Sequence, residues 1–500
     1  MNRKSRKFLP QDDFNKEGEN YFLLPFRFIN INKHKELLVN DVGDYIISDI
    51  GTARKVVNRE IDKSGSLYAD LISKFFISEK DIPELIDIQA TRYRTKKSFL
   101  DEFTALHIFV ITLRCDHTCH YCQVSRQTSN KSKYDMSKKN LDRSIDLMFK
   151  SPSKHITMEF QGGEPLLAFD NVKYAIERAD KLSKTNNKEI TFVICTNLAS
   201  ITEEQLHFCK DHEVLISTSY DGPKFIHDSN RNFSKGSSHE VVTKKIDLVR
   251  KILGEDQISA LMTTTNLTLQ YPIEIIDDYL AMGFNNIFLR PISPYGFAIK
   301  NEKKNKYEIE NFIDFYIKGL SHIIDINRKG RFFSEDYSTI ILSKILTPLP
   351  VGYVDLQSPS GAINSAIVYN YNGFVYASDE SRMLAEMSDE TFNLGHVKDN
   401  SYNQIFYGEK SKNIAKYSCN EALPGCSECG FQTFCGADPI YNHATQGDMT
   451  GYRPTNGFCK KNMDIMRYLF NLISDDNDIM GIFTNWVHKG KYDFELRNEA

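Results

Sequence analysis

The sequence lacks the features of a membrane or secreted protein. No apolar run in its 500 residues approaches the ~18 residues that a membrane helix needs, and LHIFVITL at 106–113 has the length of a strand. The N-terminal stretch MNRKSRKFLPQDD is basic but has no apolar segment of a secretory signal. We therefore expect a cytoplasmic protein without membrane contact.

An excess of charge of one sign is also missing. The 62 Lys and Arg residues nearly balance 66 Asp and Glu residues, for a net charge of −4. A general nucleic-acid-binding protein is usually basic across one face, so no nucleic-acid partner is expected. Internal repeats and low-complexity tracts are absent too, and a prior of ~150 residues per domain suggests about three globular domains.

The hydrophobic pattern divides the chain into segments. We expect a disordered N-terminus (1–20), a small α+β unit (21–100), an α/β core (101–335), a loop-rich segment (336–475) and a tail (476–500). In the core, strand-like runs alternate with helical stretches, which predicts a parallel sheet with right-handed crossovers, either doubly wound or in a barrel. The strand-like runs are 106–114, 155–160, 190–196, 214–220, 258–265 and 286–291.

The ten cysteines are clustered. Three lie at 115–122, five at 419–459, and only Cys195 and Cys209 stand apart, in a hydrophobic strand and an amphipathic helix where we expect core positions. Clusters of thiols in a large cytoplasmic chain indicate metal binding rather than disulfides.

The first cluster, LRCDHTCHYCQ, is one ligand short of a tetrahedral site. Structural zinc with His117 or His120 as fourth ligand is one interpretation, but zinc sites usually pair two ligand couples from separate segments. The alternative is a metal centre with one open position for a reactant. The position of the cluster directly after the first core strand favours this alternative, because α/β folds place their chemistry there.

The spacing Cys115-x3-Cys119-x2-Cys122 resembles the signature of the radical S-adenosylmethionine (SAM) superfamily. The resemblance implies a partial (β/α)6 barrel of the TIM type. It also implies a [4Fe–4S] cluster whose fourth iron binds SAM, an external electron donor, and a 5′-deoxyadenosyl radical that abstracts hydrogen from the substrate. Tyr121 matches the aromatic residue that packs near the adenine in this family.

Other strand ends extend this resemblance. GGEP, with Gly162, Gly163 and Glu164, follows the second strand, where the family contacts the SAM amino group. In TSYDGP (218–223), Ser219 fits a ribose contact and Asp221 assists it. Asn197 and Arg290 end two further strands, where a ligand contact and a simple hydrogen-bonded strand end are equally good interpretations. Glu159 faces the same region, with a structural role as the alternative.

The second cysteine cluster predicts another metal centre. A zinc ribbon is the simple interpretation, but the pattern resembles the SPASM domain of peptide-modifying radical SAM enzymes. That resemblance implies one auxiliary [4Fe–4S] cluster, because Ser378 and Pro439 stand where the family has ligands of a second one. Cys419 has no assigned role. The implied ligands of the auxiliary cluster are Cys426, Cys429, Cys435 and Cys459.

Asp379 is the candidate catalytic residue. It occupies the position of an aspartate that acts as a base in sulfatase-maturating relatives. A structural salt bridge, with Arg382 and Glu380 close by in the sequence, is equally plausible.

The layout resembles a SPASM-type peptide maturase, and the terminal motifs resemble one of the two radical SAM maturases of His-Xaa-Ser systems. This implies a peptide or protein substrate with His-Xaa-Ser repeats, and a second radical SAM maturase as a partner. The alternatives are a sulfatase-maturating type of enzyme and a non-catalytic iron–sulfur or zinc protein for electron transfer. The unit 21–100 is either a leader-peptide grip, by strand addition, or a packing cap.

Overall fold

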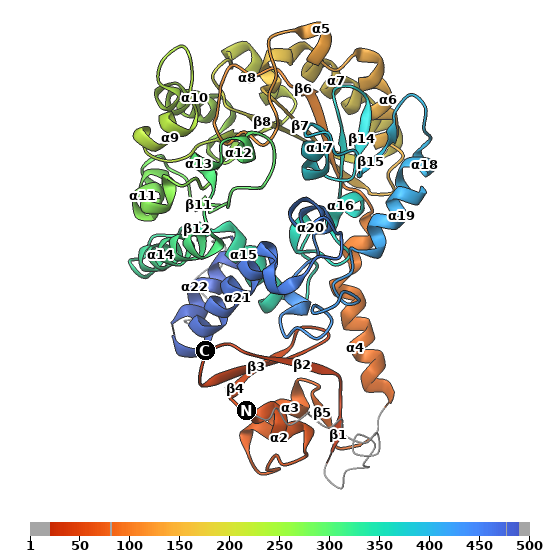
Figure 1. Cartoon of the computed structure of the whole chain (residues 1–500), viewed down its shortest axis with the longest axis vertical. Helices are drawn as coiled ribbons and strands as arrows, with labels where there is room; N and C mark the ends of the chain where they lie inside the picture. Colours follow the sequence, from red (N-terminus) through yellow and green to blue (C-terminus); the bar gives the residue numbers. More distant parts are fainter. Residues whose placement is uncertain (1–20, 81–82, 477, 490–500) are drawn as a thin grey trace. The chain divides into compact units, whose positions relative to one another are not determined.

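The structure is a computed structural model that describes residues 21–80, 83–476 and 478–489. Two compact units make up the chain. The first comprises the residues up to Lys96 together with Glu428–Thr433, and the second comprises Lys97–Ser427 and the residues from Phe434 onward. Figure 1 shows both units, coloured along the sequence. The predicted disordered segment 1–20 lies outside the described residues.

The first unit is a small α+β structure, as the sequence pattern predicts. Its antiparallel sheet has the order β2-β3-β4, and β1 pairs with β5 in a separate antiparallel ladder. Buried apolar residues from this sheet and two helices, among them Leu38, Val56 and Phe76, form its core. The elements are β1 (Phe22–Leu23), β2 (Phe26–Asn30), β3 (Lys35–Asn40), β4 (Tyr45–Asp49), α2 (Thr52–Val57), α3 (Ser66–Ser73), β5 (Ile77–Ser78) and α4 (Pro83–Lys96).

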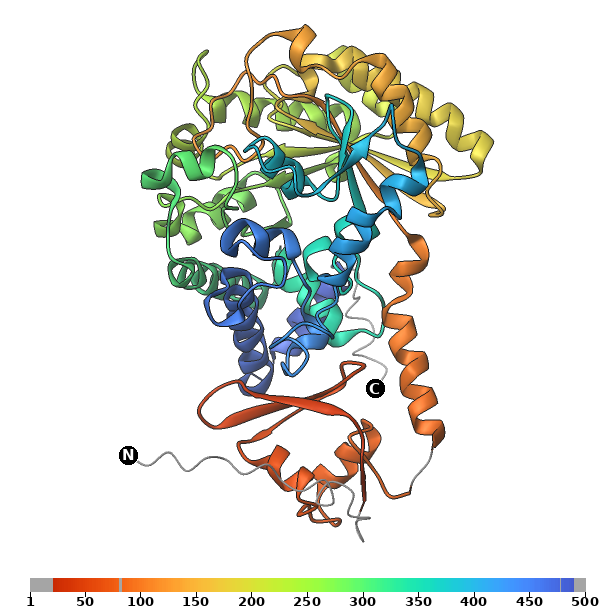
Figure 2. The ribbon, with the colours of Figure 1, turned by 45° about the vertical axis from the view of Figure 1, so that its right-hand side comes forward.

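The second unit is built on an eight-stranded sheet with the order β10-β9-β8-β7-β6-β13-β14-β15. The ladders from β10 to β13 are parallel, and β14 and β15 add antiparallel strands at one edge. Figure 2 shows how these strands fan out beside the long helices of the core. The strands are β6 (Leu106–Thr112), β7 (His155–Gly162), β8 (Glu189–Thr196), β9 (Leu215–Ser219), β10 (Ile258–Leu261), β13 (Ala366–Tyr369), β14 (Phe374–Tyr376) and β15 (Asn393–His396).

The core helices form where the apolar periodicity predicts them. In α6, Leu141, Ile145 and Met148 are fully buried, which is the spacing of one helix face. Ser137 caps α6 by accepting a hydrogen bond from Asn140 N, and this cap sets where the helix begins. The helices of this part are α6 (Lys138–Met148), α7 (Phe169–Asn186), α8 (Glu203–Asp211), α9 (Lys224–Asn230), α10 (Ser238–Leu253), α11 (Pro272–Ala281) and α14 (Ile309–Arg328).

The sixth expected strand is shorter than the sequence pattern suggests. Only Asn286–Ile287 forms a strand, β11, and it pairs with β12 (Ser334–Glu335) outside the main sheet. A single backbone hydrogen bond, from Thr264 N to Arg290 O at 2.9 Å, ties the rest of this segment to the chain that follows β10. Pro291 and Pro294 explain the difference, because proline cannot donate a ladder hydrogen bond. The barrel therefore stays partial, as predicted.

The chain after residue 335 contains more helix than the expected short strands and loops. The apolar face of α21, including Ile465 and Leu469, is buried, which explains this helix. No helix among the described residues is long and apolar enough to cross a membrane. The main helices here are α15 (Asp336–Leu346), α17 (Asp379–Ala385), α18 (Tyr402–Phe406), α19 (Glu409–Lys416), α20 (Pro439–Gln446), α21 (Gly457–Asp475) and α22 (Ile479–Val487).

Candidate functional site

A cavity of about 230 Å³ lies at the carboxyl ends of the parallel strands. Residues that directly follow β6, end β7 and β9, or follow β8 line it, which is where α/β folds concentrate their chemistry. Most of the residues singled out from the sequence meet here. The cavity-lining residues among them are Cys115, Cys119, Tyr121, Cys122, Gly162, Gly163, Asn197, Ser219, Arg290 and Asp379.

The loop that carries the three thiols is held by the chain that follows α9. Thr118 N donates to Asn232 O at 2.8 Å, and His120 N donates to Asn230 O at 3.3 Å. Burial raises the pKa of the Cys119 thiol to about 12, although the nearby positive charge of Arg231 lowers it. Free thiolates are therefore unfavourable at this site unless a cationic centre binds them.

The two histidines of the loop are engaged elsewhere. His117 lies between Asp116 Oδ1 at 2.8 Å and Ser238 Oγ at 2.9 Å, one at each ring nitrogen. The ring nitrogens of His120 face Asn305 Oδ1 at 2.7 Å and Asn230 Oδ1 at 3.1 Å. Neither histidine presents a free nitrogen to the thiols, so the structure offers no support for a zinc ion with a histidine as fourth ligand.

The three thiols fit a cluster better than a single ion. Among the described residues, no group of three or more Cys, His, Asp or Glu side chains is arranged to hold one metal ion. The cysteines are nevertheless all half-buried and line one cavity. Thiolates are the ligands of iron–sulfur clusters, which are larger than a single ion. Cys115, Cys119 and Cys122 would hold such a cluster.

The glycine pair after β7 brings its backbone against the start of the cysteine loop. Gly163 N donates to Thr112 O and Glu164 N donates to Arg114 O, both at 2.7 Å. A Cβ atom on Gly163 would lie 2.2 Å from Arg114 O, and Gly162 has a φ of +138°. Only glycine permits this approach, so the motif couples the second strand end to the metal-binding loop.

Replacing Gly163 by alanine is expected to distort this junction. Because the added methyl group would meet backbone oxygens rather than a movable side chain, we expect the free energy of unfolding to fall by ~1–3 kcal/mol, with weaker SAM binding. Urea denaturation and equilibrium dialysis with SAM would measure both effects. The control is Gly352→Ala, because a Cβ there meets nothing within 4 Å. If Gly163→Ala and Gly352→Ala had the same free energy of unfolding and the same affinity for SAM, the expectation would be wrong.

Glu164 lies behind the cavity wall rather than in it. Its carboxylate accepts hydrogen bonds from Asn197 N at 2.8 Å, Thr196 Oγ1 at 2.7 Å and Leu166 N at 3.0 Å. Burial raises its pKa to about 7, although these hydrogen bonds lower it. Its side chain thus ties the end of β8 to the turn after β7 and positions Asn197, instead of lining the cavity as a direct cofactor contact would.

Asp221 also lies outside the cavity lining, in a buried network. Arg231 pairs with it at 3.1 Å, and Tyr121 Oη donates to it at 2.9 Å. The Arg231 guanidinium also lies over the Tyr121 ring, 5.3 Å from its centre. Asp221 therefore fixes the aromatic residue that precedes Cys122. Of the two residues expected at the end of β9, only Ser219 lines the cavity.

Asp379 has the salt-bridge partner that the sequence suggested, whereas its role as a base stays a prediction. Its carboxylate lines the cavity and also pairs with Arg382 at 3.2 Å. Arg382 is fully buried and donates to Val124 O at 3.3 Å, so it links α17 to the end of the cysteine loop.

Sequence reasoning missed Cys195 and Arg231, which both line the cavity. The expectation that Cys195 belongs to the core is wrong, because alternate residues of β8 point to opposite faces. Ile194 and Thr196 are buried on one face, and Cys195 points the other way. This alternation, with a period of two residues, is the sequence signal that could have identified Cys195 as a cavity residue. No pattern marks Arg231, since it lies in an irregular segment after α9.

The second cysteine cluster spans both units. Cys429 belongs to the first, whereas Cys426, Cys435 and Cys459 belong to the second, so the set of four remains a prediction. Cys459 is in the first turn of α21, and Asn462 Nδ2 of the same helix lies 3.7 Å from Cys435 Sγ.

The two positions that lack the expected cysteines have structural roles. Ser378 caps α17 by accepting a hydrogen bond from Ser381 N, and Pro439 is the first residue of α20. Serine at an N-cap and proline at a first helical position are both favoured in helices. These residues therefore serve helix starts in this chain, and the presence of one auxiliary cluster rather than two stays a prediction.

Comparisons with known proteins agree with this geometry. Residues 109–279 match the family model of the radical SAM superfamily. The match confirms the expected cofactor of this segment, a [4Fe–4S] cluster with SAM, and the predicted fold class. The cysteine-type anaerobic sulfatase-maturating enzyme of Clostridium novyi (strain NT) is 25% identical over 376 residues, which is 71% of this chain and 93% of that protein.

Two kinds of solved structure share the fold. Native anSMEcpe with bound AdoMet has a TM-score of 0.61 at 21% identity, covering 75% of this chain and 100% of that chain. Streptococcus suis SuiB bound to the precursor peptide SuiA has a TM-score of 0.52 at 13% identity, covering 88% of this chain and 100% of that chain. At these identities the likeness shows a shared fold.

Proposed function

We propose that this protein is a SAM-dependent radical enzyme that modifies a peptide or protein substrate. The observation that carries the proposal is one cavity that combines three thiols, the glycine pair, Ser219 and a carboxylate, Asp379. A carrier of electrons alone has no use for such a cavity beside its cluster. When bound, the cluster and SAM supply the electron and the hydrogen-abstracting group.

The residues of the chain have distinct parts in this proposal. Cys115, Cys119 and Cys122 hold the cluster, and Tyr121, Gly162, Gly163, Asn197, Ser219 and Arg290 face SAM, with Glu164 and Asp221 holding them from behind. Asp379 accepts a proton from the substrate at its carboxylate. Cys426, Cys429, Cys435 and Cys459 hold one auxiliary cluster, and an external donor supplies electrons. The clustering of the cysteines, which indicates metal binding rather than disulfides, supports a cytoplasmic location, which is a reducing compartment.

Anaerobic reconstitution tests the enzyme proposal. We expect about eight irons per chain, as two [4Fe–4S] clusters require, and formation of 5′-deoxyadenosine from SAM with dithionite as electron donor. The measurements are iron and sulfide content and chromatography of the products. A protein that carries its full iron content and forms no 5′-deoxyadenosine would contradict the proposal and favour an electron-transfer role.

Within this class, the resemblance of the terminal motifs supports a substrate protein with His-Xaa-Ser repeats and a second maturase as partner. Similarity to sulfatase-maturating enzymes supports a sulfatase as the second candidate. The helix-capping Ser378 and helix-starting Pro439 favour the first, because the sulfatase type retains both auxiliary clusters. Incubation with a His-Xaa-Ser repeat peptide and with a sulfatase-motif cysteine peptide, followed by mass spectrometry, would separate the two candidates.

A further inference from the structure

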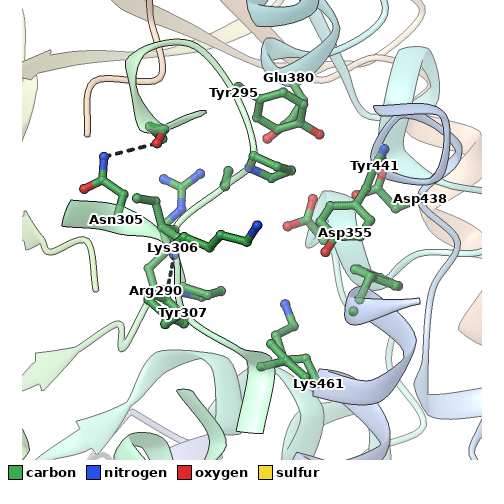
Figure 3. A pocket seen from close by; sticks show the side chains of 18 of the residues that line it. Arg290, Tyr295, Asn305, Lys306, Tyr307, Asp355, Glu380, Asp438, Tyr441 and Lys461 are labelled. Carbon is green, nitrogen blue, oxygen red and sulfur yellow. Dashed lines mark hydrogen bonds between the residues drawn. The ribbon is translucent and has the colours of Figure 1, made fainter. Parts of the chain in front are cut away.

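A second cavity, of about 440 Å³, adjoins the first in the unit that contains the core sheet. Arg290 lines both cavities, and the consecutive residues Asp379 and Glu380 line one each. Figure 3 shows the second cavity, with side chains from several separate segments directed into it. Its volume is in the range of small-ligand sites, so it can accept a side chain of a substrate whose reacting atoms lie in the first cavity.

The charges of this cavity are not balanced. Three half-buried carboxylates, Asp355, Glu380 and Asp438, line it together with two cations of low exposure, Arg290 and Lys461. Within the described part of the chain, none of these three carboxylates forms an ion pair within 4.0 Å. Burial and mutual repulsion raise the pKa of Glu380 to about 8 and that of Asp438 to about 7. The exposed Glu302, Glu308 and Lys306 also line the cavity, so five acidic side chains stand against three basic ones in its lining.

A buried hydroxyl without a partner points to a missing ligand. Tyr295 is 1% exposed, its Oη has no hydrogen-bond partner among the described residues, and its ring lines the same cavity beside Glu380 (Figure 3). Leaving such a hydroxyl unsatisfied costs ~1–3 kcal/mol. Proteins usually satisfy buried polar groups, so a ligand atom that hydrogen-bonds to Tyr295 would remove this cost.

The walls suit an organic cation better than a metal ion. The carboxylates belong to no described group of three or more donors that could hold one ion. Tyr295, Tyr307, Tyr353 and Tyr441 surround them with aromatic rings. Aromatic faces attract ammonium, guanidinium and imidazolium groups, and carboxylates accept hydrogen bonds from all three.

We propose that this cavity binds a positively charged side chain of the peptide substrate, next to the residue that reacts beside Asp379. The inference rests on the proposed function in that it takes the substrate to be a peptide. Glu380 and Asp438 are the recognition groups, and Tyr295 contributes a hydrogen bond. The cation offsets the excess of acidic over basic side chains in the lining of the cavity.

The recognition is expected to depend on pH. Because their pKa values are raised, the carboxyl groups of Glu380 and Asp438 are largely neutral at about pH 6 and charged at about pH 8.5. A guanidinium stays charged over this whole range. The affinity of the cavity for a guanidinium therefore rises with pH. The other titratable or charged groups that line the cavity are Arg290, Tyr295, Glu302, Lys306, Tyr307, Glu308, Tyr337, Tyr353, Asp355, Tyr441 and Lys461.

Calorimetric titration of the reconstituted full chain with blocked tripeptides tests the proposal. The probes are Ac-Gly-Xaa-Gly-NH2 with arginine or lysine as Xaa, both of which stay cationic from pH 6 to pH 8.5, and with glutamine as the neutral reference. We expect at least one cationic probe to bind about tenfold more tightly than the glutamine probe at pH 8.5, and less so at pH 6. The probe that binds most tightly identifies the cationic group.

Two variants and a matched control complete the test. Glu380→Gln and Tyr295→Phe should each remove most of the preference for the cationic probe, whereas Asp314→Asn, an exposed change of the same charge on α14, should leave it intact. Formation of 5′-deoxyadenosine without peptide is measured in the same samples. Absence of this product contradicts the proposed function. If 5′-deoxyadenosine forms but no cationic probe is preferred, the inference about the second cavity is wrong while the proposed function stands. The same holds if the preference survives Glu380→Gln.

Discussion

Replacing Cys119 by alanine is expected to abolish SAM cleavage and to lower the iron content from about eight to about four per chain. Cys115, Cys119 and Cys122 line one cavity, and the two thiols left in the variant cannot hold a cluster that needs three protein ligands. Both ring nitrogens of His117 and of His120 have other partners, so neither histidine can replace the lost ligand. Iron analysis and 5′-deoxyadenosine formation measure the two effects.

Two further cysteine variants control this result. Cys209→Ala changes a fully buried thiol on α8 and should keep both the iron and the cleavage. Cys429→Ala should keep SAM cleavage and lose turnover of the peptide, because it touches only the proposed auxiliary cluster. If Cys429→Ala abolished SAM cleavage as completely as Cys119→Ala, the division of labour between the two clusters would be wrong.

Replacing Asp221 by alanine is expected to lower the free energy of unfolding by ~3–5 kcal/mol. The change leaves the Arg231 guanidinium, which pairs with Asp221 at 3.1 Å, as an unpaired charge in the interior. It also removes the acceptor of Tyr121 Oη, so the loop of the three thiols loses a support. Urea denaturation under anaerobic conditions measures the loss.

An exposed ion pair provides the matched comparison. Asp146 pairs with Arg178 at 2.6 Å on the surface, and Asp146→Ala should cost less than ~1 kcal/mol. The double variant Asp221→Ala/Arg231→Leu should recover part of the stability, since it removes the unpaired charge together with its partner. A cost for Asp221→Ala no larger than that for Asp146→Ala would show that the buried network does not support the loop.

The sequence alone determined the fold class and the first metal centre. Alternating apolar runs, each bounded by turns, specify strands and helices locally, and β6 to β10 formed in the expected order. Three cysteines within eight residues need no tertiary information, because their spacing already places them on one loop. The positions of Gly162 and Gly163 in the sequence likewise place them at the end of β7, the next core strand after β6.

Only the tertiary structure decided what depends on contacts between distant segments. Whether a strand-end side chain reaches a cavity or turns behind it depends on partners elsewhere in the chain. For this reason Glu164 and Asp221 lie behind the cavity wall, whereas Cys195 lines the cavity. The second cavity depends even more strongly on contacts between distant segments. Asp355, Glu380 and Asp438 are far apart in the sequence, and only the packing of the chain brings them to one cavity, where burial raises the pKa of Glu380 and of Asp438.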